Sequence, residues 1–259
     1  MPRSTSNGPA LPSSTSRASR SDKIISFIKP ARLLRLLRGY GASASLRKLL
    51  LVASLAALAS FAGPAVADTP TVVALGDSLT AGYGLPTEDG FVPRLQRWLT
   101  DHGTAAVLVN AGVSGDTTAG GLARTDWTLT PDVGGLIVTL GGNDLLRGLA
   151  PEEARANLDA ILAKAQARKL PVLLIGLVAP GNYGPAYKAA FDAIYPDLAA
   201  KYATLYVRNF LAPIADKPDR ALALKTLMQA DGIHPNAKGV ALIVEALGPE
   251  VQELVRRAR

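Results

Sequence analysis

Residues 71–80 read TVVALGDSLT, and this stretch indicates the fold of the chain. Its first five residues are apolar or β-branched, which is typical of a strand that is buried on both faces. The Gly-Asp-Ser-Leu run that follows is a change to small and polar residues. In an open α/β sheet, the loops at the carboxyl ends of the strands carry the chemistry. Ser78 is therefore the first candidate functional residue.

Four more short apolar runs have the same character, and patterns typical of helices separate them. The expected strands are 71–75, 106–110, 135–140, 171–177 and 204–207. The expected helices are 91–102, 151–168, 187–202 and about 236–257. This alternation predicts a doubly wound α/β sheet of about five parallel strands with helices on both faces.

Residues 1–67 differ in charge from the rest of the chain. They hold ten Lys and Arg and one acidic residue, a net charge of +9. Residues 68–259 hold eighteen Lys and Arg and twenty Asp and Glu, a net charge of −2. The basic character therefore belongs to a leader, and the globular part offers no basic face for nucleic acid. We place the domain boundary at 67/68.

The leader has the order of segments of a secretory signal peptide. Residues 1–22 are rich in Ser, Arg and Pro and are expected to be disordered. Residues 23–38 predict a basic amphipathic helix that makes transient contact with a membrane surface. An apolar run from Leu49 to Ala62 and the small residues Ala65-Val66-Ala67 follow. We expect cleavage after Ala67 and a periplasmic or secreted protein.

Two alternatives for the leader stay open. An uncleaved anchor would use Leu49–Ala62, although this run is shorter than the roughly 20 residues that span a bilayer and Gly63-Pro64 interrupts its extension. The 48 residues before the run are long for a signal peptide. They indicate either a translation start further downstream or a segment that acts at a membrane surface.

The rare residue types exclude several kinds of site. The chain has no cysteine, which excludes disulfides, a thiolate nucleophile and metal sites built on cysteine. It has only two histidines, His102 and His234, too few for a histidine-rich metal centre. We therefore expect neither a metal nor a cofactor. His102 follows Asp101 at the end of a predicted helix and is expected to be a surface residue.

His234 is the natural partner for a serine nucleophile. An imidazole that takes the serine proton needs an acceptor that holds its tautomer. Asp231 precedes His234 by three residues, so one turn can present its carboxylate to the ring. The same Asp-x-x-His pattern could also be only a capping turn before the last helix. We predict Ser78, His234 and Asp231 as a catalytic set.

Acyl transfer also needs donors that face the developing oxyanion. Three are available: the backbone N–H of Ser78, the backbone N–H of Gly115, and the side-chain amide of Asn143. A glycine lets the backbone approach a substrate closely, whereas Asn143 could instead form only a local Asx-turn. Three acidic neighbours are expected to be structural. Asp77 is expected to point away from the site, and Asp116 and Asp144 are expected to cap helices.

These motifs resemble the conserved blocks of the SGNH/GDSL hydrolases. The matching segments, in order, are Gly76–Leu79, Asn110–Thr118 around Gly115, Gly141–Asp144 and Asp231–Pro235. The resemblance is closest to the periplasmic bacterial acyl hydrolases known as thioesterase, arylesterase or lysophospholipase. It covers essentially all of residues 68–259, which it identifies as a hydrolase domain. It implies a flavodoxin-like three-layer sandwich without a metal, a Ser78, Asp231 and His234 triad, and an oxyanion hole of Ser78, Gly115 and Asn143.

The expected activity is that of a secreted serine esterase or thioesterase. Its expected substrates are small acyl molecules (aryl esters, acyl thioesters and lysophospholipids) that react through an acyl-enzyme intermediate. One alternative is a carbohydrate O-deacetylase with the same triad, and another is an inactive membrane-surface module, which the intact triad disfavours. The chain has no P-loop or G-x-G-x-x-G pattern for a phosphate-binding protein, and no G-x-S-x-G nucleophile elbow. The oligomeric state stays open.

Overall fold

The computed structural model describes residues 69–258, which fold around one parallel sheet. The strand order is β2-β1-β3-β4-β5, and every neighbouring pair is parallel. The strands are β1 (Thr71–Gly76), β2 (Val107–Gly112), β3 (Val133–Thr139), β4 (Val172–Ile175) and β5 (Leu205–Val207). This is the flavodoxin-like order, in which the chain reverses its direction of travel through the sheet beside β1. The predicted fold class is confirmed.

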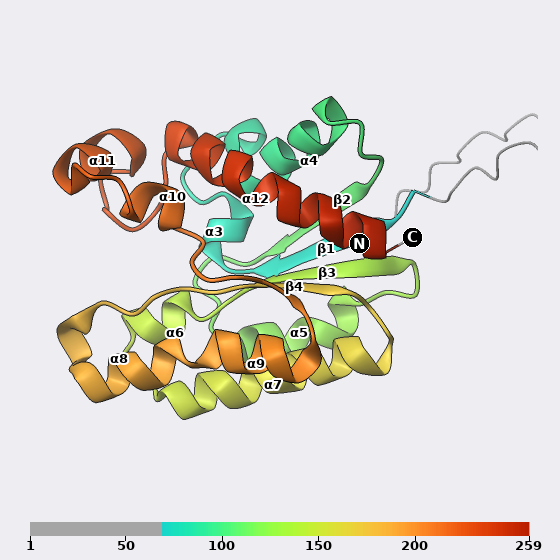
Figure 1. The fold of residues 1–259 in the computed structure, drawn as a ribbon, viewed down its shortest axis with the longest axis horizontal. Helices are drawn as coiled ribbons and strands as arrows, with labels where there is room; N and C mark the ends of the chain where they lie inside the picture. Colours follow the sequence, from blue (N-terminus) through green and yellow to red (C-terminus); the bar gives the residue numbers. More distant parts are fainter. Residues whose placement is uncertain (1–68, 259) are drawn as a thin grey trace, which may run out of the picture. The chain divides into compact units, whose positions relative to one another are not determined.

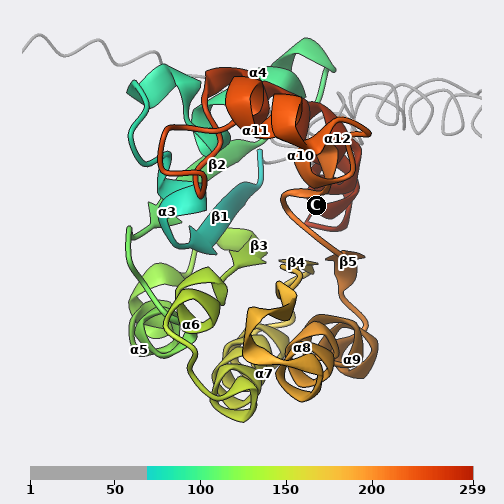
Figure 2. The ribbon, with the colours of Figure 1, turned by 90° about the vertical axis from the view of Figure 1, so that its left-hand side faces the viewer.

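Helices cover both faces of the sheet and form the outer layers of a three-layer sandwich (Figure 1). One layer holds α4 (Phe91–Asp101) and α12 (Ala237–Arg257), with α3 (Ser78–Ala81), α10 (Ala212–Ala215) and α11 (Arg220–Leu227) at its end. The other layer holds α5 (Thr118–Thr128), α6 (Gly142–Leu146), α7 (Pro151–Ala167), α8 (Pro185–Asp192) and α9 (Ile194–Tyr202). Short 3-10 helices lie at Thr87–Asp89 and Gly181–Tyr183. Figure 2 shows the sheet end-on between these layers.

The central strands supply the core because their side chains are buried on both faces. Val72 to Leu75 of β1 and Leu136 to Val138 of β3 are at most 2% exposed. Helix α12 buries a residue on every third or fourth position, which is the period of a helix with one apolar face. It packs against α4, where Gly248 leaves room for the Trp98 ring: a Cβ at this position would lie 2.5 Å from it.

The edge strand β2 differs from the expectation of full burial. Val107 and Val109 are exposed, because β2 has a neighbouring strand on only one side and no helix covers these side chains. The side chain of Gln96 covers part of the open edge. Its Nε2 donates to the Ala106 carbonyl at 3.0 Å and its Oε1 accepts from the Leu108 N–H at 2.8 Å. The Gln96 amide thus takes the place of a paired strand, at an edge that would otherwise be free to pair with a strand of another chain.

The helices also differ from the sequence prediction in several places, and α10 and α11 were not expected. The helix expected over 187–202 is divided into α8 and α9 at Ala193. Pro196 explains the break, because it has no N–H to donate to the carbonyl four residues earlier. For α5 only a start at Asp116 was expected, and no helix was predicted over its length; it begins at Thr118 with Thr117 as its cap. Its sequence TAGGLARTDWT holds two glycines and three threonines, which have low helix propensity. Gly121 is required there by packing, since a Cβ would lie 2.3 Å from Leu140.

The predictions for the leader concern residues 1–67, which lie outside the described residues. This includes the signal peptide, its cleavage after Ala67, the membrane-surface helix and the alternative anchor. Among the helices of residues 69–258, none combines the length and the apolar character that crossing a bilayer requires.

Candidate active site

The four predicted loops meet at the carboxyl edge of the sheet, at the left of Figure 1. Ser78 follows β1 directly and is the first residue of α3. Asp77 caps this short helix, since its Oδ1 accepts the Leu79 N–H at 3.0 Å. The N–H of a first helical residue has no acceptor within its own helix. The backbone N–H of Ser78 therefore remains available to a ligand beside its own hydroxyl.

Ser78, His234 and Asp231 form a continuous hydrogen-bonded series. The His234 Nε2 lies 2.8 Å from the Ser78 Oγ, and its Nδ1 lies 2.6 Å from Asp231 Oδ2. Asp231 Oδ1 accepts the N–H groups of Ile233 and His234 at 2.9 and 3.0 Å. Burial raises the pKa of Asp231, but the hydrogen bonds from His234 and Ile233 outweigh it and lower the pKa to about 2. Asp231 is thus anionic at neutral pH, and the imidazole can accept the Ser78 proton.

Local turn geometry holds the histidine in this position. Gly232 has a φ of +68°, a conformation that glycine adopts without strain. It allows Asp231 to turn back toward His234. This turn does not cap α12, whose N-cap is Asn236. The Tyr83 ring lies 4.7 Å from the imidazole, centroid to centroid. His102 lies elsewhere, at the end of α4, where its ring stacks on Trp98 at 3.8 Å.

Asn143 and Gly115 lie in the neighbouring loops, as expected for loops at one sheet edge. Asn143 is the second residue of α6, and its Nδ2 donates to the Asp116 carbonyl at 2.8 Å. The same nitrogen lies 3.5 Å from Asp77 Oδ2. Gly115 has a φ of +84°, and Arg147 donates to its carbonyl at 2.8 Å. The structure therefore joins the Asn143 amide directly to the loop that carries Gly115.

The guanidinium of Arg124 ties together the loops around Ser78 and Gly115. It donates to Asp116 Oδ2 at 2.7 Å, to the Ala111 carbonyl at 2.7 Å and to the Gly76 carbonyl at 2.8 Å. These acceptors lie at the ends of β1 and β2 and in the loop after β2. Arg124 thus joins the loops that carry Ser78 and Gly115. The Asn143 loop is joined to them separately, through the hydrogen bond from Asn143 to the Asp116 carbonyl. The sequence analysis did not identify Arg124.

The three acidic neighbours have roles that differ in part from the expected ones. Asp77 does not point away from the site: its side chain lines the cavity beside Ser78. Burial raises the pKa of Asp77 to about 6, although the Leu79 N–H opposes this rise. Asp116 is not a helix cap, because Thr117 caps α5 and Asp116 pairs with Arg124. Asp144 lies in the first turn of α6, and its carboxylate accepts from the N–H and Oγ1 of Thr118 at the start of α5.

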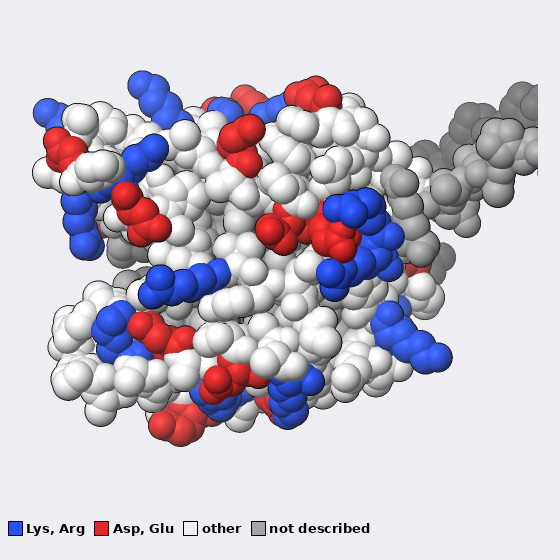
Figure 3. Space-filling view, in the orientation of Figure 1, with Lys and Arg blue, Asp and Glu red and all other residues white. Residues whose placement is uncertain are grey.

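A cavity of about 440 Å³ opens beside Ser78 and His234. Much of its wall is apolar: Leu79, Leu145, Leu146, Leu177, Val178, Pro180, Leu211, Ala215 and Ile233. Polar groups come from Asn143, Asn182, Asn209, Tyr183 and Arg220. At the left of Figure 3, a hollow lies between the upper part, which carries α10 and α11, and the lower part, which carries α6 and α8. Within residues 69–258, no cluster of three His, Asp or Glu side chains could hold a metal ion.

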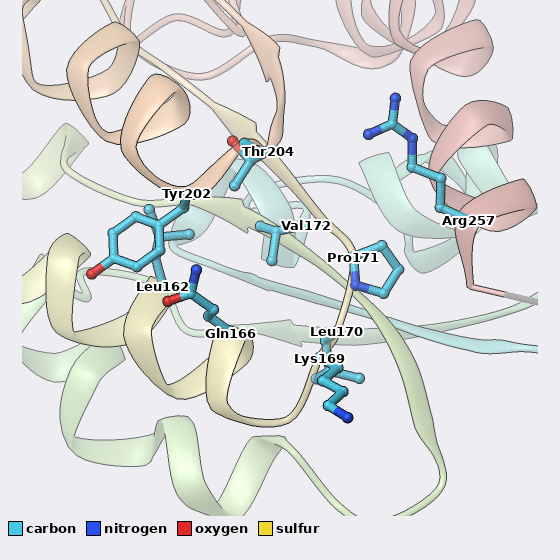
Figure 4. A pocket seen from close by; sticks show the side chains of 10 residues that line it. Leu162, Gln166, Lys169, Leu170, Pro171, Val172, Tyr202, Thr204 and Arg257 are labelled. Atoms are coloured by element: carbon cyan, nitrogen blue, oxygen red, sulfur yellow. The ribbon is translucent and has the colours of Figure 1, made fainter.

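A second cavity, of about 360 Å³, lies at the amino ends of β4 and β5. Its wall includes Leu162, Pro171, Val172, Tyr202 and Thr204, but neither Ser78 nor His234 (Figure 4). Figure 4 also shows Lys169 and Arg257 on different sides of this hollow. The combination of a hydroxyl, an imidazole and a carboxylate thus belongs to the first cavity.

Comparison with known proteins agrees with this geometry. Residues 74–242 match the GDSL-like lipase/acylhydrolase family. The chain is 40% identical to "Esterase TesA" of Pseudomonas aeruginosa over 73% of this chain and 91% of that protein. It is 36% identical to "Thioesterase 1/protease 1/lysophospholipase L1" of Escherichia coli K12, over 73% and 86%. The crystal structure of AlinE4, an SGNH-hydrolase family esterase, shares 47% identity at a TM-score of 0.59, over 73% of this chain and 98% of that one.

The resemblance drawn from the four sequence blocks is confirmed by these relatives. Their shared activity and the extent of the match show that the enzyme hydrolyses carboxylic esters and acts on small acyl substrates. The chain belongs to the GDSL-like lipase/acylhydrolase family.

Proposed function

We propose that the protein hydrolyses acyl esters and thioesters in two steps, with Ser78 as the nucleophile. The observation that carries this proposal is the Ser78–His234–Asp231 series, with separations of 2.8 and 2.6 Å. In the first step Ser78 Oγ bonds to the acyl carbon while His234 Nε2 takes its proton. The imidazolium then gives this proton to the departing alcohol or thiol, and an acyl-enzyme forms.

Water resolves the acyl-enzyme in the second step. His234 accepts a proton from water as the oxygen attacks the acyl carbon, and it returns that proton to Ser78 Oγ as the carboxylic acid leaves. Asp231 remains an anion throughout, which stabilises the imidazolium and holds its orientation. The low pKa of Asp231, about 2, supports this role.

The negative charge that develops on the acyl oxygen is met by three donors in this proposal. They are the N–H groups of Ser78 and Gly115 and the Nδ2 of Asn143. One N–H of Asn143 donates to the Asp116 carbonyl at 2.8 Å. The other makes only a long contact of 3.5 Å with Asp77 Oδ2, which an oxyanion would replace in this proposal. Donors that are already in place stabilise charge in the transition state without further rearrangement.

The cavity supports an acyl chain rather than an acetyl group. Leu145, Leu146, Leu177, Val178 and Pro180 form an apolar wall from α6 and the segment after β4. An acyl chain that lies against this wall removes apolar area from water, which contributes about 0.8 kcal/mol for each buried CH₂ group. We therefore favour aryl esters, acyl thioesters and lysophospholipids over O-acetylated carbohydrates as substrates.

Export is part of the proposal, and it rests on the order of segments in residues 47–67. Cleavage after Ala67 would release a periplasmic or secreted enzyme that begins at Asp68. The basic residues 23–38 would make only transient contact with a membrane surface before cleavage.

The test is hydrolysis of a matched series of esters by the purified protein and its Ser78→Ala variant. The 4-nitrophenyl esters of acetate to decanoate measure chain-length preference, and acyl-CoA thioesters measure the leaving group. We expect kcat/KM to rise from acetyl to longer chains and to fall by at least about 10³-fold in the variant. A strict preference for acetyl would favour the deacetylase, and retained activity in Ser78→Ala would refute the proposed nucleophile.

A further inference from the structure

The two walls of the catalytic cavity differ in chemistry. The wall built by α6 and the segment after β4 is mostly leucine, valine and proline. The opposite wall comes from the α10–α11 region and contributes Leu211, Ala215 and Arg220. Figure 2 shows α10 and α11 on one side of the sheet and α6 and α8 on the other. An acyl chain on the apolar wall therefore leaves the other half of the substrate near Arg220.

Arg220 is the only lysine or arginine in the wall of this cavity. It is an exposed residue in the first turn of α11. The adjacent carboxylate, Asp219, caps the helix by accepting the Leu222 N–H at 2.9 Å. Asp219 is therefore turned toward the helix backbone rather than paired with Arg220.

The lack of a partner sets Arg220 apart from most arginines in residues 69–258. Eight others donate to carboxylates or carbonyls, including Arg94, Arg124 and Arg155. For Arg220 and Arg208 no hydrogen bond or ion pair is formed within this part of the chain, and Arg208 does not line the cavity. Arg220 thus offers an unused guanidinium to a molecule bound beside Ser78.

We propose that Arg220 binds an anionic group on the leaving half of the substrate. The inference rests on the proposed function, and it names the residue that would select, among those esters and thioesters, the substrates whose alcohol or thiol half carries a carboxylate or phosphate. A guanidinium suits both groups, because its planar fork can donate two parallel hydrogen bonds to their oxygens. Since Arg220 and Ser78 line the same cavity of about 440 Å³, the anionic group belongs to the part of the leaving half that enters this cavity.

The positions of the other ionisable groups in the cavity wall also favour binding of the anionic group at Arg220. The other ionisable groups in the cavity wall are Tyr183, Asp77 and His234, and the last two lie at the base beside Ser78. Burial raises the pKa of Asp77 only to about 6, so Asp77 is an anion at neutral pH and repels a fixed negative group placed beside it, while the donors at the base serve the oxyanion. An anionic leaving half is therefore best placed at the Arg220 wall, away from Asp77.

Two pairs of esters test the proposal, and each pair differs in one charge. The first pair is 4-nitrophenyl butyrate and 3-carboxy-4-nitrophenyl butyrate. The second is monobutyryl glycerol and its glycerol phosphate counterpart, which separates phosphate from carboxylate. For each enzyme the ratio of kcat/KM between the charged and the neutral ester is measured, so that the intrinsic reactivities of the esters cancel between variants.

The variants are Arg220→Gln, Arg220→Lys and the control Arg208→Gln, which removes the same charge from a residue outside the cavity wall. Arg220→Gln should lower the charged-to-neutral ratio by about tenfold, mainly through KM, as expected for one charge-assisted contact. Arg220→Lys should retain part of the ratio, and Arg208→Gln should leave it unchanged. A loss with only one of the two pairs would identify the anion that Arg220 binds.

Two outcomes would overturn the inference while the proposed function stands. One is equal loss on charged and neutral esters in Arg220→Gln, which would mean that the residue only supports the wall. The other is unchanged kcat/KM on every ester, which would mean that Arg220 contacts neither half of the substrate. Failure of the unmodified enzyme to hydrolyse the neutral esters would instead refute the proposed function, and the inference with it.

Discussion

Replacement of Arg124 by methionine tests whether one side chain holds the catalytic loops in place. Methionine has a similar length but cannot donate to Asp116, Ala111 or Gly76, which now accept at 2.7, 2.7 and 2.8 Å. The side chains of Arg124 and Asp116 are 23% and 14% exposed. Solvent therefore screens the pair only in part, and the variant leaves the Asp116 carboxylate largely buried without its partner.

The magnitude follows from these contacts. A hydrogen bond to a charged group contributes about 1.5–3 kcal/mol, and three are lost, but water can re-solvate part of the exposed edge. We expect the free energy of unfolding to fall by about 2–4 kcal/mol, which lowers the Tm by about 5–15 °C for a domain of this size. The kcat should fall by about 10–100-fold with little change in KM, because the oxyanion donors are displaced by a fraction of an ångström to about 1 Å.

Thermal melts and ester hydrolysis below the melting range separate the two effects. Arg124→Lys keeps a positive charge for Asp116 but cannot reach all three acceptors. Its kcat should therefore lie between those of the unmodified protein and Arg124→Met. Arg155→Met is the matched control, because the Arg155–Asp197 pair is 37% and 58% exposed and such pairs contribute about 0–1 kcal/mol. An unchanged kcat in Arg124→Met would refute the positioning role. If the Tm also stayed unchanged, the loops would be held by other contacts.

Further predictions address the site residues one at a time. A fluorophosphonate probe should label Ser78, and labelling that persists in Ser78→Ala would contradict the assignment. Asn143→Ala should lower kcat by roughly 10²–10³-fold at nearly constant KM. Asp231→Asn should also slow the labelling of Ser78, because it misorients the imidazole. Equal, modest losses of activity in Asn143→Ala and Asp231→Asn, with matching falls in Tm, would show that Asn143 and Asp231 only hold their loops in place. Because the pKa of Asp77 is raised to about 6 in the folded state from 3.8, its contribution to stability is complete below about pH 4 and is lost as the pH rises through 6. The unmodified protein should then lose up to about 3 kcal/mol over this range, and melts of Asp77→Asn should be flat there. N-terminal sequencing of the exported protein should begin at Asp68, and a retained Leu49–Ala62 segment would favour the anchor.

Much of the fold was predictable because its signals are local. Each strand is a short apolar run, and the predicted and observed strands differ by at most about two residues at their ends. The Asp231–His234 contact was predictable for the same reason, since three residues and one turn join the two side chains. The extent of α5 was missed, although a helix start at Asp116 was expected, because its glycines and threonines disfavour an isolated helix. The helix forms where Gly121 can pack against Leu140 and where Asp144 accepts from Thr118 at its first turn.

The sequence by itself determined the parallel α/β class, the family and the identity of the candidate catalytic residues, because these depend on periodicity and short motifs. Only the tertiary structure decided which distant side chains meet. Ser78 reaches His234 across 156 residues, and Arg124 reaches the Gly76 carbonyl across 48. The burial that raises the pKa of Asp77 and the position of Arg220 in the cavity wall likewise arise only when the loops converge. The reason is physical: backbone preferences act between neighbours along the chain, whereas desolvation and side-chain pairing depend on the packing of segments that are far apart in it.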